Sequence, residues 1–279
     1  MSEECVGRFR MTTPENVVVA SRSQSIYGVE VKTEPLRSAP AGRQWERRLE
    51  ALEKVPALPG KKSAIRSRLS LDTGVEAVWY DDGPHSLMLE AMKPFGDHAL
   101  WIATDADAGK EPVAEKLARA VVAAYNPGTG YGYCVGFGSV RMGPSLSETA
   151  RINFEHSGTS GAKIEFASQT VRDPDTKTYM NLNEERDFVK ASGGTLTVLL
   201  ERERTVAALR GKEMRISMTI PGEAPMFRFT WHFEGVPGDG TKPKINLVGG
   251  SAASGQAKLE TAWDDLLISI AAVPVKAPR

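Results

Sequence analysis

Residues 5–9 read Cys-Val-Gly-Arg-Phe, and residues 134–138 read Cys-Val-Gly-Phe-Gly. Each run heads one half of the chain and holds one of its two cysteines. An extended, proline-containing stretch follows each run, and then a charged helical segment, several strand-like segments and a closing helix. The repeated order predicts a duplicated domain, and two similar lobes on one chain suit a protein that binds.

The first half shows the periodicities of both strands and helices. Residues 27–31 alternate apolar and polar side chains, as a half-buried strand does. Apolar residues recur at helical spacing over 45–55, with charged residues on the other side. Turn-forming residues join three strand-like runs at 75–80, 86–92 and 99–103, which predicts an antiparallel meander. A helix over about 112–125 closes this half.

The second half follows the same plan. Its predicted strands cover 150–154, 162–169, 195–200, 213–220, 227–233 and 244–248, and its predicted helices cover 184–191 and 256–272. The clearest strand is 227–233, where Phe227, Phe229, Trp231 and Phe233 alternate with other residues to make one aromatic face.

The predicted fold class is α+β, with two similar lobes that each consist of an antiparallel sheet covered by helices. The turn-forming and helix-breaking run at 126–130 is the best boundary, which places an N-terminal lobe at 1–127 and a C-terminal lobe at 128–279. A single parallel α/β sheet is the alternative, and the alternation within the strands argues against it.

Composition narrows the class of protein. The 279 residues are 41% hydrophobic and 25% charged, which is typical of a soluble globular protein. Lys plus Arg equals Asp plus Glu at 35 each, so no net charge attracts the chain to nucleic acid. No apolar run approaches the roughly 20 residues that span a bilayer. Residues 1–4 lack the apolar core of a signal peptide, so we expect either a cytoplasmic protein or a mature form.

The two cysteines permit one disulfide, and their matching positions favour a bridge between Cys5 and Cys134. The alternative is two unrelated buried thiols. Neither cysteine belongs to a Cys-x-x-Cys pair or to a cluster with histidines, so we expect no metal site.

Motifs for catalysis are absent from the sequence. It has no nucleophile elbow, phosphate-binding loop or His-Glu-x-x-His helix, so we assign no catalytic residue and no cofactor. His85 and His98 could approach each other at neighbouring turns of the meander, and an enzyme would need one of them to meet a carboxylate in a cleft. The aromatic face of 227–233 could form a glycan or small-molecule platform, although a buried face is the favoured interpretation.

Several short runs then suggest a family. Residues 5–9 and 27–31 resemble the opening of the immunity proteins that protect bacteria against lipase effectors of type VI secretion. Residues 133–140 are similar to the start of that family's C-terminal domain, and 211–213 and 263–267 also fit it. The resemblance covers nearly the whole chain, and its specificity lies in the order and spacing of the runs.

This resemblance implies a non-enzymatic inhibitor in the periplasm, often anchored by a lipid in its native precursor. The implied partner is a cognate phospholipase or lipase of the α/β-hydrolase type, whose lid the two domains grip so that substrate cannot enter. We expect turns of the meander and the cleft between the lobes to contact it, and the candidate contact residues are Asp81, Asp82, His85, Arg172 and Asp173. The competing function is a periplasmic small-molecule or glycan-binding module.

Overall fold

The computed structural model describes residues 2–276 except 37–40, 129, 158–160 and 174–181. Its first repeat contains β1 (Ser2–Gly7), β2 (Phe9–Thr13), β3 (Val17–Ile26), β4 (Val29–Pro35), α1 (Ala41–Glu53), β5 (Ile65–Asp72), β6 (Val75–Asp81), β7 (Ser86–Phe95), β8 (His98–Asp107), α2 (Glu111–Ala124) and β9 (Tyr125–Asn126). Its second repeat contains β10 (Tyr133–Val135), β11 (Gly138–Val140), β12 (Glu148–His156), β13 (Lys163–Gln169), α3 (Leu182–Ala191), β14 (Thr195–Val206), β15 (Leu209–Thr219), β16 (Met226–Phe233), β17 (Lys244–Ala252), a short 3₁₀ turn, α4 (Gln256–Ser269) and β18 (Ala271–Ala272).

The two repeats have the same order of elements and the same order of strands in space. The strands of the first follow the order β3-β4-β8-β7-β6-β5, and those of the second follow β12-β13-β17-β16-β15-β14. Neighbouring strands within both sets run antiparallel. The expected α+β class with antiparallel sheets is therefore confirmed.

The repeated Cys-Val-Gly run forms a tight β-hairpin in each half. Val6 pairs with Phe9 across the turn Gly7-Arg8, and Val135 pairs with Gly138 across Gly136-Phe137. The first turn residue has a positive φ in both hairpins, 60° at Gly7 and 52° at Gly136. Two-residue hairpins with glycine at this position match the right-handed twist of the flanking strands. The glycine of the repeat is therefore the residue that permits the turn.

The chain folds into two compact units, which do not coincide with the two repeats. Each unit contains the hairpin of one repeat and the sheet of the other. The first unit joins the chain up to Ser23 to Pro144–Val273, and the second joins Gln24–Gly143 to the residues after Val273. In the first unit, β2 pairs with β18 directly after α4. In the second unit, β11 pairs with β9 directly after α2. The lobes expected at 1–127 and 128–279 stay a prediction, because each compact unit combines the hairpin of one repeat with the sheet of the other.

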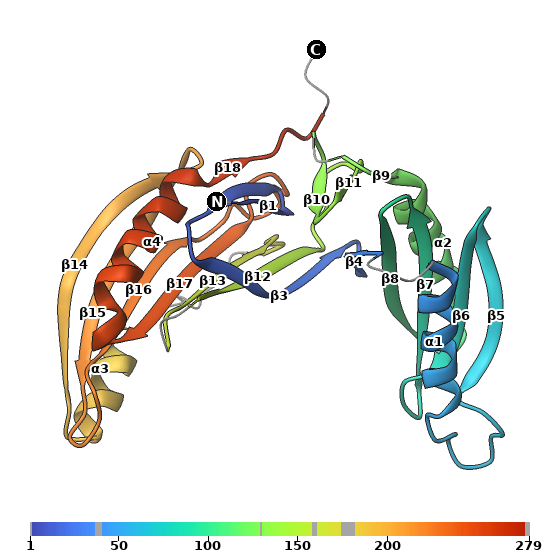
Figure 1. Ribbon diagram of the computed structural model, residues 1–279, viewed down its shortest axis with the longest axis horizontal. Helices are drawn as coiled ribbons and strands as arrows, with labels where there is room; N and C mark the ends of the chain where they lie inside the picture. Colours follow the sequence, from blue (N-terminus) through green and yellow to red (C-terminus); the bar gives the residue numbers. More distant parts are fainter. Residues whose placement is uncertain (1, 37–40, 129, 158–160, 174–181, 277–279) are drawn as a thin grey trace. The chain divides into compact units, whose positions relative to one another are not determined.

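The sheet of the second unit has a helix on each face. Trp79 of β6 donates its indole N–H to Glu115 of α2 at 3.0 Å, so α2 covers one face. On the other face, Trp45 and Leu52 of α1 pack into a buried cluster with Val78, Tyr80 and Met92 of the strands. Trp45 also lies against Trp101 of β8, with ring centres 5.9 Å apart. Figure 1 shows both helices beside β5–β8.

The sheet of the first unit is covered by α4 on one face. Gly249 of β17 lets the helix approach closely, because a Cβ there would lie 3.1 Å from Leu259 and Trp263 of α4. The edge of Trp263 packs on Phe229 of β16. On the opposite face, α3 pairs Glu185 with Arg228 of β16, toward the β14 edge of the sheet. Figure 1 shows α4 lying along these strands.

Several strands were not predicted from the sequence, namely the short strands β1, β2, β9, β10, β11 and β18 and the longer strand β5. Residues 65–72 form β5 at the edge of the sheet, and their basic side chains resemble those of a solvated loop. Edge strands often carry charged residues, which discourage pairing with other chains. The expected strands at 75–80, 86–92 and 99–103 are present as β6, β7 and β8.

Candidate functional site

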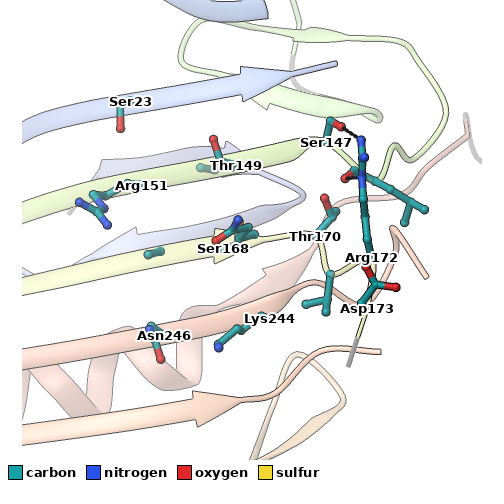
Figure 2. Close-up of a pocket in the computed structure, with 15 residues that line it drawn as sticks. Ser23, Ser147, Thr149, Arg151, Ser168, Thr170, Arg172, Asp173, Lys244 and Asn246 are labelled. Carbon is teal, nitrogen blue, oxygen red and sulfur yellow. Dashed lines mark hydrogen bonds between the residues drawn. The ribbon is translucent and has the colours of Figure 1, made fainter. Parts of the chain in front are cut away.

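An open groove of about 990 Å³ lies on the first unit, on the sheet face that α4 leaves uncovered. Its walls and floor come from Ser23 of β3, from β12 and β13 with the loops beside them, and from the start of β17. Figure 2 shows the polar side chains that line it. The groove lies within one compact unit.

The alternation of the strands explains the polar floor. Ala150 and Ile152 of β12 are buried on the α4 side, whereas Arg151 between them is exposed on the groove side. Ala167 of β13 lies opposite Arg151 on one side and Asn246 of β17 on the other. Because Ala167 has the smallest side chain of that row, the centre of the floor stays low.

Three cationic side chains and one carboxylate line this groove. The cations are Arg151, Arg172 and Lys244, and the carboxylate is Asp173. Arg172 donates to the Ser147 hydroxyl at 2.8 Å, which holds its guanidinium at the rim (Figure 2). The lining therefore carries an excess of positive charge although the whole chain is neutral.

The candidates Arg172 and Asp173 thus lie together at this groove, and both are exposed. The candidates Asp81 and His85 line a different, smaller hollow of about 270 Å³ on the second unit. Asp82 and His85 are exposed at the β6–β7 turn. The carboxylate of Asp81, however, is only 3% exposed and pairs with Lys61 at 3.1 Å and Arg66 at 2.8 Å, so it fastens the strand end.

The alternative in which His85 and His98 approach each other is wrong. His85 lies at the β6–β7 turn, whereas His98 begins β8 at the β7–β8 turn, so a strand length of about 30 Å separates them. His98 is buried, with one ring nitrogen 2.9 Å from Asp97 and the other 2.8 Å from the Tyr125 hydroxyl. It also stacks on Phe137, and this packing gives His98 a structural role.

The aromatic face of β16 is part of the core, as favoured from the sequence. Phe229 and Trp231 are 0% and 1% exposed. The indole N–H of Trp231 donates to the carbonyl of Arg204 at 3.0 Å. Neither ring is available as a platform for a glycan.

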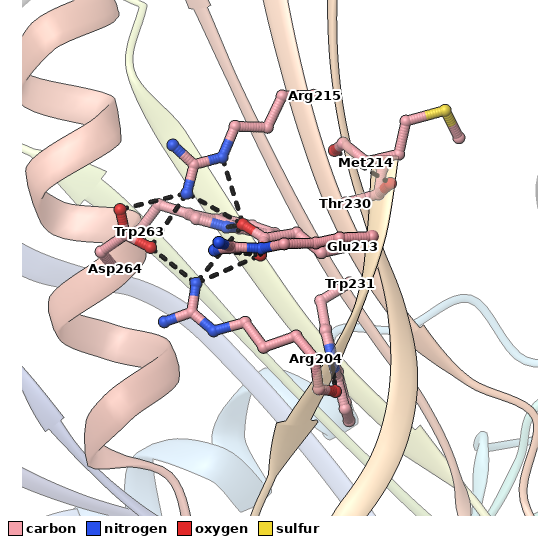
Figure 3. A network of polar contacts seen from close by, with 9 residues as sticks. Arg204, Glu213, Met214, Arg215, Thr230, Trp231, Trp263 and Asp264 are labelled. Atoms are coloured by element: carbon pink, nitrogen blue, oxygen red, sulfur yellow. Dashed lines mark hydrogen bonds and ion pairs between the residues drawn. The ribbon is translucent and has the colours of Figure 1, made fainter. Parts of the chain in front are cut away.

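A buried polar network fastens α4 to the sheet of the first unit (Figure 3). The Glu213 carboxylate of β15 is fully buried and accepts hydrogen bonds from Arg215 at 2.9 Å and from the Trp263 indole at 3.0 Å. Asp264 of α4 pairs with the same Arg215 at 2.9 Å and with Arg204 at 2.6 Å. Each arginine is therefore shared between a strand carboxylate and a helix carboxylate.

Electrostatics keep both carboxylates of this network charged. Burial alone would raise the pKa of Glu213, but hydrogen bonds from Arg215, Arg202 and Trp263 outweigh it and hold the pKa below its usual range. Burial likewise acts to raise the pKa of Asp264, and hydrogen bonds from Arg204 and Arg215 lower it overall.

This network explains two of the runs on which the family resemblance was based. Glu213 ends the run 211–213, and Trp263 and Asp264 begin the run 263–267. Gly211 permits close packing, because a Cβ there would lie 2.6 Å from the Trp231 ring. The two runs are far apart in sequence and meet at one structural site.

The cysteines lie in the two exchanged hairpins, Cys5 in β1 and Cys134 in β10, and both side chains are buried. Their pairing stays a prediction. Within the described part of the chain, no group of three or more His, Cys, Asp or Glu side chains is placed to hold a metal ion. The described helices include none that is long and apolar enough to cross a membrane.

Sequence comparison assigns the family. Residues 127–270, more than half of the chain, match the model of the Tle cognate immunity protein 4 C-terminal domain. This chain belongs to that family. The resemblance to immunity proteins of type VI lipase effectors is thereby confirmed. Among the curated proteins, none matches the sequence.

Solved structures of immunity proteins share the fold over the full length. A chain in the crystal structure of the Tle4–Tli4 complex superposes with a TM-score of 0.77 at 16% identity, covering 98% of each chain. The apo immunity protein TplEi of the type VI secretion system of Pseudomonas aeruginosa gives 0.75 at 16% identity, over 98% of this chain and 97% of that one. TplEi complexed with an "L" peptide gives 0.71 at 15% identity, over 98% of both chains.

Proposed function

We propose that this chain is an immunity protein that binds a cognate lipase effector of type VI secretion and blocks its activity. The family match over 127–270 carries this proposal. The shared fold with two immunity proteins, over 98% of the chain, supports it. The comparisons do not favour a glycan-binding module, and the buried Trp231 leaves that alternative without its platform.

The chain acts by binding and not by catalysis. Its buried carboxylates Glu213 and Glu148 are engaged by arginines that hold the fold together. His98 is enclosed between aromatic rings. These groups stabilise structure, and the side chains left for a partner are those on the open faces and turns.

The proposed mechanism is capture of the effector's lid. A lipase lid opens to admit substrate, and a protein that binds the lid in one state shifts that equilibrium by its difference in affinity for the two states. Two binding units on one chain add to this, because the second contact forms at a high effective concentration once the first has formed. The exposed Asp82 and His85 of the second unit and Arg172 and Asp173 of the first are the proposed contacts.

The proposed location is the periplasm, which the family supports. A disulfide between Cys5 and Cys134 would form in that oxidising compartment. The intact mass of protein expressed in the periplasm tests the pairing. We expect one bridge, whose reduction adds two hydrogens, and two free thiols before reduction would contradict it.

The proposed function is tested by co-expression in a bacterial host. The cognate lipase effector is directed to the periplasm, and growth is followed with and without this chain in the same compartment. We expect the effector alone to arrest growth and the chain to restore it. The effector with its nucleophilic serine replaced is the control for toxicity unrelated to lipase activity.

Continued arrest in the presence of the folded, exported chain would contradict the proposal. The lid mechanism is tested separately with an effector whose lid segment has been shortened. We expect that effector to bind this chain at least tenfold more weakly, and undiminished affinity would show that the lid is not the contact.

A further inference from the structure

We infer that the groove on the first unit binds an extended, acidic segment of the effector. This inference rests on the proposed function and names the part of the partner that this surface recognises. It starts from the sheet of the second repeat, where no described helix covers the strands that line the groove.

The groove lies beside α3 on the same face of the sheet, over strands that no described helix covers. In the second unit, α1 packs on the face opposite the closing helix α2, and its Trp45 reaches Trp101 of β8. The equivalent helix of the first unit, α3, pairs with β16 toward the sheet edge. Among the described residues, no helix covers the polar floor made by β12, β13 and the start of β17.

The cations of the groove stand at a spacing that suits an extended chain. Arg151 lies in the row of Ala167 and Asn246, and Lys244 lies in the neighbouring row with Thr149 and Gln169. Arg151 and Lys244 are two strands apart across the sheet and two residues apart along the strands. Their Cα atoms are therefore separated by about 12 Å. An extended segment covers that distance in about four residues.

The ligand chemistry follows from the charges. Arg151, Lys244 and Arg172 outnumber Asp173, so carboxylates three or four residues apart on the partner would each meet a cation. The exposed Thr149 hydroxyl and Gln169 amide add polar groups along the floor. Charge complementarity of this kind favours one register of the bound segment and speeds the association of the two proteins.

The existing contact of Arg151 does not block this role. Arg151 lies 3.5 Å from Glu165, and both side chains are accessible, at 56% and 32%. Exposed pairs of this kind contribute little to stability, so the guanidinium can turn to a ligand at small cost. The low centre of the floor at Ala167 leaves room for the partner's backbone.

The test is the affinity for the purified lipase effector, measured by calorimetry with the full chain. The double charge reversal R151E/K244E is compared with K163E/R210E, which makes the same change in charge at exposed positions of the same unit outside the groove. We expect the groove variant to bind at least about 30-fold more weakly, and the control to stay within threefold. The wild-type affinity should also fall as salt is raised.

A second variant tests the groove without changing charge. Ala167→Phe raises the floor, and we expect at least tenfold weaker binding with an unchanged melting temperature of the free chain. If the wild type binds but both groove variants bind equally well, the inference is overturned and the proposed function stands. Equal weakening by the control pair would assign the effect to net charge and overturn the inference as well.

The last measurement is the binding of inorganic phosphate alone. Phosphate that binds the wild type and not R151E/K244E, while the effector affinity of that variant is unchanged, would assign the groove to a free anion and overturn the inference. A wild-type chain that does not bind the effector at all would remove the proposed function itself.

Discussion

The two repeats build the same sheet and treat its second face differently. In the second unit, α1 buries Trp45 and Leu52 against that face. In the first unit, α3 lies against β16 on the equivalent face, and the strands beside it carry Arg151 and Lys244 and line the groove. One region of this face therefore adds to the hydrophobic core, and another presents polar and charged side chains at a groove. The difference indicates where stability and where binding are located.

The hairpins show the same divergence on a smaller scale. The turn residue Arg8 makes a buried, two-pronged ion pair with Glu148, at 2.6 and 3.0 Å. Its counterpart Phe137 is 48% exposed and stacks on His98 with ring centres 5.4 Å apart. One hairpin is fixed by charge inside the protein, and the other is fixed by an aromatic contact at the surface.

The largest loss of stability is expected when the packing under α1 is disrupted. Trp45→Ala removes a buried indole from the cluster under α1, and we expect the free energy of unfolding to fall by about 3–5 kcal/mol. Arg151→Ala on the open face should change it by no more than about 0.5 kcal/mol. Urea unfolding measures both. Equal losses would show that the open face also contributes to the core.

The two hairpin contacts should also differ in stability, with the buried ion pair of Arg8 contributing more than the half-exposed ring of Phe137. Arg8→Ala leaves Glu148 buried without its cation, and we expect a loss of about 3–5 kcal/mol. Phe137→Ala removes a half-exposed ring and should cost about 1–2 kcal/mol. Thermal and urea unfolding distinguish these values.

A matched double variant separates the ion pair from general damage at the first hairpin. Replacing Arg8 by Met and Glu148 by Leu together should recover most of the stability, because apolar packing can substitute for a buried ion pair. A double variant as unstable as Arg8→Ala would contradict this account of the anchor.

The smallest effect concerns pH and the network of the first unit. The pKa of Glu213 is lower in the folded chain than its ordinary value of about 4.3, so its stabilising contribution is complete above that pH and is lost as the pH falls through the folded pKa. The wild type should therefore lose stability more steeply below about pH 4.3 than Glu213→Gln does. The variant should still lose some, because Asp264 and Glu90 also have lowered pKa values. Parallel curves would show that Glu213 is not the titrating group.

The sequence predicted the parts of this fold that local patterns encode. Strong turn residues and alternation located β6, β7 and β16, and the repeated Cys-Val-Gly run marked the duplication. The exchange of hairpins was not predictable, because both hairpins have the same local pattern and their partners are chosen by contacts distant in sequence. The strand β5 was missed because its polar edge resembles a loop.

The groove was only partly predictable for a similar reason. Arg172 and Asp173 were among the candidates, whereas Arg151 and Lys244 were not. The position of Arg151 between two buried residues of a strand indicates that it faces away from the core, and that signal was available. What the sequence lacks is the register that brings Lys244 to the same floor, and the position of α3 that leaves the floor open.

The central claim is that this chain neutralises a lipase effector by binding it. The most direct measurement combines calorimetry of the purified pair with the lipase activity of the same mixtures. We predict a one-to-one complex and lipase activity that disappears as the chain reaches equimolar concentration. Full lipase activity in the presence of excess folded chain, with no heat of binding, would contradict the account.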